Sequence, residues 1–454
     1  MAVCSSIMST HICRLLELAS RASCCLAITS QSSLRRTMLV APRVPGLPML
    51  HTRAYSLDSL SPGPGRPTLG ANSQQPRAER ASPSSPLAHR NLSAVAMKGQ
   101  YRSMSFNDFL DVGELEDNIR QARACKKVRR FIVDPDLAKV VAHHLGPDLN
   151  SDKTILIECN PGPGVLTKTL LNSGVRKLVA LETEKNFLNE LRGLEALLDG
   201  QLEVAHCDFF RLDPVWGGSN KPSVMSTDKL FNDLGITETN WSDDFPVKVV
   251  AIVPQNKERA ILLKLVYALF ERLSFYRYGR VELNLFLSER EYTVMMTPAG
   301  QMRHYRPLSV LWQMACHIEL LHKEPWESFV TSKQNLPPPK GLLPNDHICL
   351  VRLRPRADLF SGGLTPANAS TLMVMVKQCL AKKKGRLIDK LNLWSPDSGS
   401  KLLSAMGLPQ DILTGQLHPM QYLQLFQMMD KSQEFTQSWL YEEIMENTEK
   451  EGWG

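Results

Sequence analysis

The stretch Ile155-Leu-Ile-Glu-Cys-Asn-Pro-Gly-Pro-Gly-Val-Leu-Thr167 decides the fold of this chain. An apolar run enters a glycine-bearing turn and helix-forming residues follow, so we predict a buried strand, a tight turn and a helix. A second apolar run, residues 178–182, ends on Glu182, which follows Gly162 by 20 positions. Such a turn lets the backbone approach a nucleotide-like ligand, and a carboxylate at the next strand end can accept from ribose hydroxyls. We therefore predict a nucleotide-type pocket in which Asn160 replaces the first glycine of the usual turn.

Apolar runs alternate with helical segments on both sides of this stretch. Strands are predicted at residues 155–158, 178–182, 202–205, 247–253 and 281–287. Helices are predicted at residues 106–124, 135–145, 165–173 and 258–273. This alternation is typical of an α/β fold with a mostly parallel, doubly wound sheet of the Rossmann type. Residues 211–246 interrupt it as an insertion, and 348–354 alternate in polarity as an edge or hairpin strand would.

Two further regions flank this α/β core, which we assign to residues 101–357. Residues 358–454 contain only helical patterns, at 365–382, 386–393, 400–405, 409–414 and 419–446, and end in an acidic stretch. They predict a small C-terminal helical domain. The first 100 residues carry 11 Lys and Arg against three Asp and Glu, which leaves 42 basic and 43 acidic residues in the remainder. A nucleic-acid surface on the folded part must therefore be a local patch.

The composition of the N-terminal region predicts targeting. Residues 1–55 are rich in arginine and serine and contain one acid, Glu17, which is the composition of a mitochondrial transit peptide. The alternative is a merely disordered tail, which does not explain the missing acids. Residues 56–100 are rich in serine, proline and glycine and predict a disordered linker. Ten cysteines without metal-ligand spacing favour a reducing compartment and no metal site, and no run of about 18 apolar residues predicts a membrane span.

An acidic set of residues points to the type of ligand. Asp208 follows the third predicted strand, where its carboxylate can accept from an adenine amine, as Glu182 can from a ribose. No Lys-Ser or Lys-Thr follows Gly162 and Gly164, which excludes a phosphate-binding P-loop. An acidic site without a phosphate anchor suits S-adenosylmethionine. The alternative is a glycine turn that merely packs a helix against the sheet.

Several motifs together resemble the rRNA adenine dimethyltransferase family. They are Phe131-Ile-Val-Asp-Pro-Asp-Leu-Ala138, the Glu158–Thr167 pattern, Glu182, Asp208, Glu289-Arg-Glu291, Leu308-Ser-Val310 with Gln313, and Val351-Arg-Leu-Arg-Pro355. The resemblance covers about residues 125–357. It implies a class I methyltransferase core that uses S-adenosylmethionine to dimethylate two adjacent adenines of small-subunit rRNA. By position, it assigns the cofactor contacts to Ile132, Asn160, Gly162, Glu182 and Asp208.

The chain departs from this family at the catalytic segment. The family carries Asn-Leu-Pro-Tyr or Asn-Leu-Pro-Phe after the fourth strand, whereas this chain carries Ile252, Val253, Pro254 and Gln255. The asparagine would accept hydrogen bonds from the target amine, and the aromatic ring would stack on the everted base. The Gln-Asn pair that precedes the first family motif is Arg129-Arg130 here. Together with Asn160, these changes predict weak or lost methyl transfer, and no residue is assigned as catalytic.

A mitochondrial branch of the family combines such a leader with a degraded catalytic segment. This likeness implies a transcription initiation factor of the matrix nucleoid that joins mitochondrial RNA polymerase, with other mitochondrial transcription factors, and holds the non-template strand of melted promoter DNA. An active dimethyltransferase of small-subunit rRNA and a structural ribosome-assembly factor remain open. The candidate nucleic-acid contacts are Arg129, Arg130, Lys340, Arg352, Arg354 and Arg356, with a second patch at Lys382, Lys383, Lys384 and Arg386. Each cluster could equally be a solvated face.

Overall fold

The structure is a computed structural model that describes residues 109–145, 154–213, 225–332, 347–432 and 435. The predicted transit peptide, the linker, Lys340 and the acidic end of the chain lie outside these residues, so their predictions stay untested. The same holds for residues 214–224 of the 211–246 insertion. Within the described part of that insertion, a helix runs from Thr227 to Asp233 (α6).

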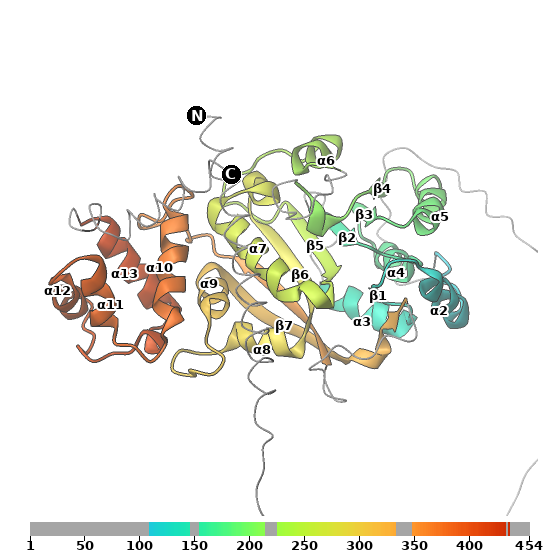
Figure 1. The fold of residues 1–454 in the computed structure, drawn as a ribbon. Helices are drawn as coiled ribbons and strands as arrows, with labels where there is room; N and C mark the ends of the chain where they lie inside the picture. Colours follow the sequence, from blue (N-terminus) through green and yellow to red (C-terminus); the bar gives the residue numbers. More distant parts are fainter. Residues whose placement is uncertain (1–108, 146–153, 214–224, 333–346, 433–434, 436–454) are drawn as a thin grey trace, which may run out of the picture. The chain divides into compact units, whose positions relative to one another are not determined.

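A seven-stranded sheet forms the centre of the α/β core, in the order β4-β3-β2-β5-β6-β9-β7 (Figure 1). Its strands are β2 (Ile155–Cys159), β3 (Leu178–Glu182), β4 (Leu202–His206), β5 (Val247–Ile252), β6 (Val281–Ser288), β7 (Cys316–Pro325) and β9 (His347–Pro355). The first five in the order are parallel, and β9 and β7 close the sheet in antiparallel pairs. The predicted α/β fold with a mostly parallel sheet is confirmed.

The antiparallel end of the sheet corrects one expectation. Strand β9 was expected as an edge or hairpin strand; it pairs antiparallel with β7, as a hairpin strand would, but β7 and not β9 takes the edge of the sheet. Strand β7 has no clear apolar alternation, because most of its side chains are exposed or half-buried, and sequence patterning therefore missed it. A separate two-stranded ladder joins β1 (Arg130–Phe131) to β8 (Val330–Thr331) in antiparallel register.

Strand alternation gives the sheet two apolar faces. Leu156 and Val250 point into a core shared with helices α3 and α4, whereas Ile157 and Val249 point into the larger core under α7 and α9. The helices of the α/β core are α2 (Leu115–Ala124), α3 (Pro135–Leu145), α4 (Val165–Asn172), α5 (Lys185–Glu195), α7 (Glu258–Glu271), α8 (Glu289–Met296) and α9 (Pro307–Ala315). A sheet with helices on both faces is the doubly wound arrangement predicted from the sequence.

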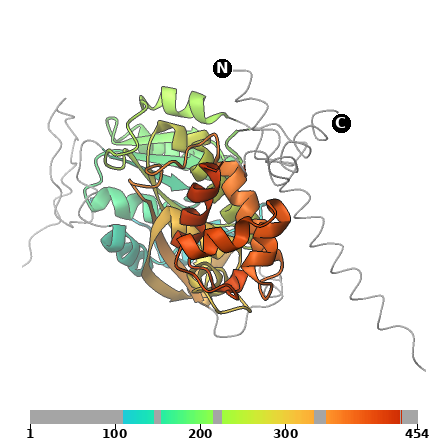
Figure 2. The same cartoon turned by 90° about the vertical axis from the view of Figure 1, so that its left-hand side faces the viewer.

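Helices follow the last strand, and they share the larger core. They are α10 (Ala369–Ala381), α11 (Leu387–Trp394), α12 (Ser398–Ala405) and α13 (Pro419–Asp430). Figure 2 shows them in front of the sheet in orange and red. Leu372 and Leu425 belong to the same buried cluster as Leu311 of α9, so the helical region is packed on the sheet region by a continuous apolar core.

Two helix predictions were wrong in detail. Residues 409–414 were expected as a helix, but their backbone bonds to the chain at the start of α11: Leu387 N donates to the Ile412 carbonyl and Thr414 N to the Gly385 carbonyl. That pairing takes the groups that a helix would use. The helix predicted from residue 106 begins at Leu115 in the described part, two residues after Gly113, whose φ of +79° suits a turn.

Candidate functional site

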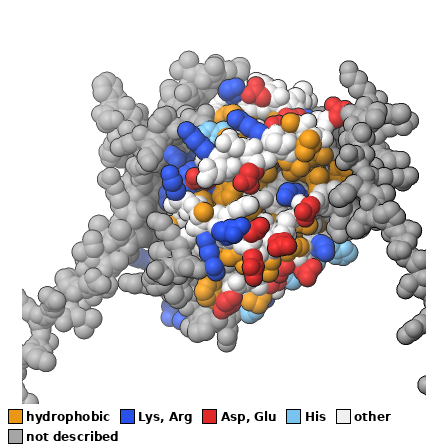
Figure 3. All heavy atoms as spheres, turned by 90° about the vertical axis from the view of Figure 1, so that its right-hand side faces the viewer, with side chains coloured by type: hydrophobic (Ala, Val, Ile, Leu, Met, Phe, Trp, Pro, Cys, Tyr) orange, Lys and Arg blue, Asp and Glu red, His pale blue; other side chains and the backbone are white. Residues whose placement is uncertain are grey.

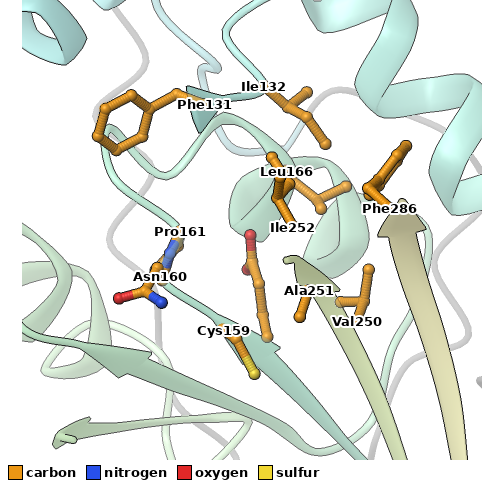
Figure 4. A pocket seen from close by; sticks show the side chains of 11 residues that line it. Phe131, Ile132, Cys159, Asn160, Pro161, Leu166, Val250, Ala251, Ile252 and Phe286 are labelled. Atoms are coloured by element: carbon orange, nitrogen blue, oxygen red, sulfur yellow. The ribbon is translucent and has the colours of Figure 1, made fainter. Parts of the chain in front are cut away.

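A pocket opens at the carboxyl ends of β2 and β5, the edge of an open parallel sheet where ligands bind in this architecture. It encloses about 310 Å³, part of which is open to solvent. Its lining comes from Phe131, Ile132, Glu158, Cys159, Asn160, Pro161, Leu166, Val250, Ala251, Ile252 and Phe286. Figure 4 shows the side chains of Ile132, Leu166, Ile252 and Phe286 around the same space. The structure thus brings the predicted contacts Ile132 and Asn160 together with the altered catalytic segment.

The glycine turn lies where it was predicted, and the ring of Phe131 covers its open side. Asn160, Gly162 and Gly164 all have left-handed φ values, of 56°, 64° and 79°. Asparagine tolerates this region better than most residues, which explains how it can replace a glycine here. A Cβ on Gly162 would lie 2.3 Å from Cδ1 of Phe131. The aromatic ring of Phe131 therefore lies against the turn glycine where a bound cofactor would approach the backbone.

Glu158 is a buried carboxyl at the floor of the pocket. Its side chain is 3% exposed, and its Oε2 accepts a hydrogen bond from Thr167 Oγ1 at 2.7 Å. Burial, together with a smaller effect of the nearby Glu182 carboxylate, raises the pKa of Glu158 to about 8, although the hydrogen bond from Thr167 opposes the rise. At neutral pH this carboxyl is therefore mainly protonated, so it adds a polar group to the pocket without a full charge.

Glu182 is fully buried at the tip of β3, and its carboxylate is already engaged. Gly162 N donates to Oε2 at 3.1 Å, while Thr183 N and Glu184 N donate to Oε1 at 2.5 and 2.7 Å. Arg129 Nη2 adds an ion pair to Oε1 at 2.7 Å. The carboxylate predicted to accept from a ribose thus receives four donors from the chain itself.

Asp208 lies on the next strand tip, beside the same arginine. Burial raises its pKa, which a bond from Phe210 N at 3.2 Å and the positive charges of Arg211, Lys127 and Arg129 partly offset. Because Asp208 also lies near Arg129, the guanidinium is close to both acidic residues of the predicted adenosine site. In this arrangement Arg129 already pairs with Oε1 of Glu182, so a ribose hydroxyl would have to compete with the guanidinium for this carboxylate.

The end of β5 carries the segment that would hold a target base. Ile252 is the last residue of β5 and lines the pocket, Val253 is buried, and Pro254 precedes a short 3-10 turn, η4 (Gln255–Lys257). At the position of the family's asparagine, the isoleucine side chain has no atom that could accept from an exocyclic amine. Gln255 is half-buried and has no ring for stacking. The segment therefore lines the pocket with an apolar side chain where the resemblance implies an asparagine.

The predicted arginines of strand β9 and the residue after it have partners within the protein. Arg354 Nε donates to Oε2 of the fully buried Glu282 at 2.7 Å, and Arg352 Nε lies 3.5 Å from Oε1 of the same residue. Arg352 also donates to Glu319 and to the His144 carbonyl. Arg356 contacts His317 through Nη1 at 3.4 Å. The nucleic-acid contacts proposed below therefore come from other residues.

Arg130 and a cluster missed from the sequence lie at the same sheet edge as the pocket. Burial lowers the pKa of Arg130, and the carboxylate of Glu258 at the start of α7 opposes this. The cluster joins four cations from separate segments: Arg259 of α7, Arg290 of α8, Arg306 at the start of α9 and Lys383 after α10. We call these four residues the α7–α9 basic cluster. Only Lys383 was named from the sequence, because the fold, and no local motif, brings the others together.

Like charges influence one another in this cluster. Burial lowers the pKa of Arg306, and Arg259 and Arg290 lower it further, while Glu291 opposes them. Burial and the charge of Arg306 also lower the pKa of Lys383. Arg259 is held by a bidentate pair with Glu291, at 2.6 and 3.3 Å. By contrast, the face that carries α2 and α5 has acidic and basic side chains interspersed with apolar ones (Figure 3). The cluster is thus a local concentration of positive charge, which attracts phosphates.

The described residues contain neither a cluster suited to a metal ion nor a helix suited to span a membrane. Across them, no group of three or more His, Cys, Asp or Glu side chains could hold a metal ion. Six cysteines of this part are buried and unpaired, as a reducing compartment would keep them. Burial raises the pKa of Cys207 to about 12, so its thiol is not a nucleophile. Within the same residues, no helix combines the length and the apolar character needed to cross a membrane.

The sequence matches known proteins over most of the described part of the chain. The model of the family described as ribosomal RNA adenine dimethylase matches residues 126–431. The human protein named dimethyladenosine transferase 2, mitochondrial, is 38% identical over 335 residues, which are 72% of this chain and 84% of that protein. Its bovine counterpart is 38% identical over 346 residues, 74% and 86% of the two chains. A dimethyladenosine transferase structure from Plasmodium falciparum covers 66% of this chain and 96% of its own, with 16% identity and a TM-score of 0.45.

Proposed function

This chain belongs to the ribosomal RNA adenine dimethylase family, and we propose that within it the protein acts as a mitochondrial transcription initiation factor. The family implies S-adenosylmethionine as cofactor and rRNA as substrate, and the fold of that reaction is retained. We propose that methyl transfer itself is lost, because the pocket lacks groups that the transfer needs.

One observation carries the proposal: Ile252 stands at the end of β5, in the pocket, where the target amine would need a hydrogen-bond acceptor. Methyl transfer to an exocyclic amine requires the amine lone pair to be aimed at the methyl group, and an acceptor for its N–H groups does this aiming. An apolar side chain there leaves the amine unpaired on burial, which costs free energy instead of positioning it. A base could still enter the site by apolar contact, but it would not be prepared for reaction.

The surface around this edge supports binding of unpaired nucleic acid. Arg259, Arg290 and the exposed Lys257 lie in segments that begin at the carboxyl ends of β5 and β6. Arg306 lies near Arg259 and Arg290, Lys383 lies near Arg306, and Arg130 of β1 lies near Glu258 at the start of α7. Cations along a groove bind the phosphates of a single strand whatever its sequence. We infer that the cluster follows the backbone of a melted strand at this edge.

We expect that removing two positive charges of this cluster weakens single-strand binding and its salt dependence. The double variant Arg290→Gln with Arg306→Gln should lower the slope of log K against log salt by about 1.4, since each phosphate contact of a single strand contributes about 0.7. Fluorescence anisotropy of a labelled single-stranded DNA across a salt series measures the slope. The matched control is Arg120→Gln with Arg192→Gln, two exposed arginines of α2 and α5. An equal drop in the control pair would count against a localised site.

The proposed location and partners follow from the leader and the relatives. Residues 1–55 have transit-peptide composition, and the human and bovine relatives are named mitochondrial. We therefore place the protein in the mitochondrial matrix, at the nucleoid, in a complex with mitochondrial RNA polymerase and other mitochondrial transcription factors on promoter DNA. Its task there would be to stabilise the melted promoter by holding the non-template strand.

Run-off transcription tests this role. Purified mitochondrial RNA polymerase, with the other factors that the promoter requires, is given duplex or pre-melted promoter templates with and without this protein. We expect duplex templates to depend on the protein, and pre-melted templates to be transcribed nearly as well without it. Equal transcription of duplex templates in its absence would refute the proposal.

Active dimethylation of small-subunit rRNA is the second candidate function. The observation in its favour is that Glu182, Asp208 and Pro254 are all retained at the carboxyl edge of the sheet. Under this alternative, Arg129 would have to leave Glu182 when the cofactor binds.

A further inference from the structure

Arg129 is built into the ribose end of the pocket, where no sequence motif places an arginine. Its side chain is 13% exposed; Nη2 bonds to Glu182 Oε1 at 2.7 Å and Nη1 to Asn160 Oδ1 at 2.8 Å. The guanidinium carbon also lies 4.9 Å from the ring centre of Phe131 and 5.6 Å from that of Phe187. Two directional bonds and two aromatic faces hold the group in one place.

The backbone at Arg129 is fixed as firmly as its side chain. Arg129 N donates to Ser332 Oγ at 3.0 Å, and Ser332 N donates back to the Arg129 carbonyl at 3.1 Å. Ser332 is fully buried directly after β8, beside the ladder that β8 forms with β1. The guanidinium is therefore aimed at Glu182 by a rigid support.

Two of the sequence departures meet at this contact. Asn160, which replaces the first turn glycine, supplies the amide oxygen that accepts from Arg129. Arg129 itself stands where the related family carries an uncharged residue. Asn160 adds a second acceptor for Arg129, which a glycine would not offer, and the arginine supplies Glu182 with a cation that an uncharged residue would not offer.

We propose that Arg129 is an internal lock: its guanidinium supplies to Glu182 and Asn160 the hydrogen bonds that a ribose would make, and so excludes adenosine-bearing cofactors from the pocket. An entering adenosine must first displace the arginine, so its apparent affinity falls by the fraction of molecules in which the lock is open. The same contact neutralises Glu182 in a fully buried position, so the pocket is stable without a ligand. The lock does not depend on the transcription role proposed above.

Cofactor binding by purified variants tests the lock. Equilibrium dialysis with labelled S-adenosylmethionine, and the ligand-induced rise in melting temperature, are measured for the unaltered chain and for Arg129→Gln. Glutamine can still bond to Asn160 but leaves Glu182 free of a cation. We expect Arg129→Gln to bind at least about tenfold more tightly than the unaltered chain, the worth of one charge-assisted hydrogen bond. The control Arg120→Gln removes an exposed arginine that pairs with Asp117 on α2, and its cofactor binding should match the unaltered chain.

Further variants separate the lock from a general loss of packing. Adding Glu182→Ala to Arg129→Gln should abolish the gain, because the ribose acceptor is then missing. Asn160→Gly removes one partner of Arg129 and suits the left-handed backbone at that position. If Arg129→Gln fails to fold, Asn160→Gly decides: tighter binding supports the lock and unchanged binding overturns it. The proposal is also overturned if the unaltered chain binds as tightly as Arg129→Gln, or if the gain survives Glu182→Ala.

Discussion

Replacing Glu282 with glutamine is expected to destabilise the protein by about 3–5 kcal/mol. Glu282 is fully buried in β6, where it pairs with Arg354 Nε at 2.7 Å and Arg352 Nε at 3.5 Å and accepts from Asn284 Nδ2 at 3.0 Å. Glutamine has nearly the same shape but no charge. It therefore leaves two cations of β9 at the sheet without their shared anion, and Arg352 is 11% exposed. Removing one partner of a buried ion pair is one of the larger single costs in a fold.

Urea unfolding of Glu282→Gln and of a control measures this effect. The control is Glu319→Gln, which removes another partner of Arg352, in an ion pair of 3.1 Å, but from a side chain that is 57% exposed. A solvent-exposed pair contributes about 1 kcal/mol or less, so the control should unfold close to the unaltered protein. Equal losses in both variants would show that the arginines of β9 are not held by a buried anion.

Glu158→Gln is expected to stabilise the protein more as the pH rises. Burial raises the pKa of Glu158 in the folded state to about 8. An unfolded glutamate titrates near its ordinary value, about 4.3, so between these values the folded state holds a proton that the unfolded state releases. Stability linked to Glu158 is therefore complete below about pH 4.3 and is lost as the pH rises towards 8.

The difference in unfolding free energy between Glu158→Gln and the unaltered protein should grow by about 1.4 kcal/mol per pH unit, or roughly 4 kcal/mol from pH 5 to pH 8. Denaturant unfolding at several pH values measures it. The difference between the two proteins is needed because burial also raises the pKa of Glu271 to about 8. Glu190→Gln, at an exposed glutamate of α5, is the control. A constant difference across the pH range would contradict the assignment of a buried, protonated carboxyl.

The sequence predicted those parts of the fold that depend on local patterns. Four of the five parallel strands are almost fully buried and read as apolar runs, the edge strand β4 is mostly half-buried, and each of the five was located to within about two residues. Strand β7 was missed because its exposed edge carries polar side chains without alternation. The segment 409–414 has helix-forming residues, but pairing with the chain at the start of α11 outweighed that preference.

The candidate site shows the same limit. Spacing alone brought Glu182, Asp208 and the turn to one sheet edge, because the carboxyl ends of parallel strands meet there. Whether each arginine is buried in an ion pair or free to bind a ligand depends on residues far away in the sequence. Arg352 and Arg354 alternate like a basic strand face, yet their anion is Glu282, about 70 residues earlier. Arg129 was predicted to contact nucleic acid, but its ion pair with Glu182, 53 residues away, makes it part of the pocket.

The most direct measurement of the central claim is methyl transfer itself. Purified protein is incubated with labelled S-adenosylmethionine and a small-subunit rRNA hairpin that carries two adjacent adenines. A pocket with Ile252 at the acceptor position and Arg129 on Glu182 predicts no transfer above background, while the same preparation supports transcription from duplex promoters. Robust methylation of the hairpin that Asp208→Ala abolishes would contradict the account and establish the protein as an active dimethyltransferase.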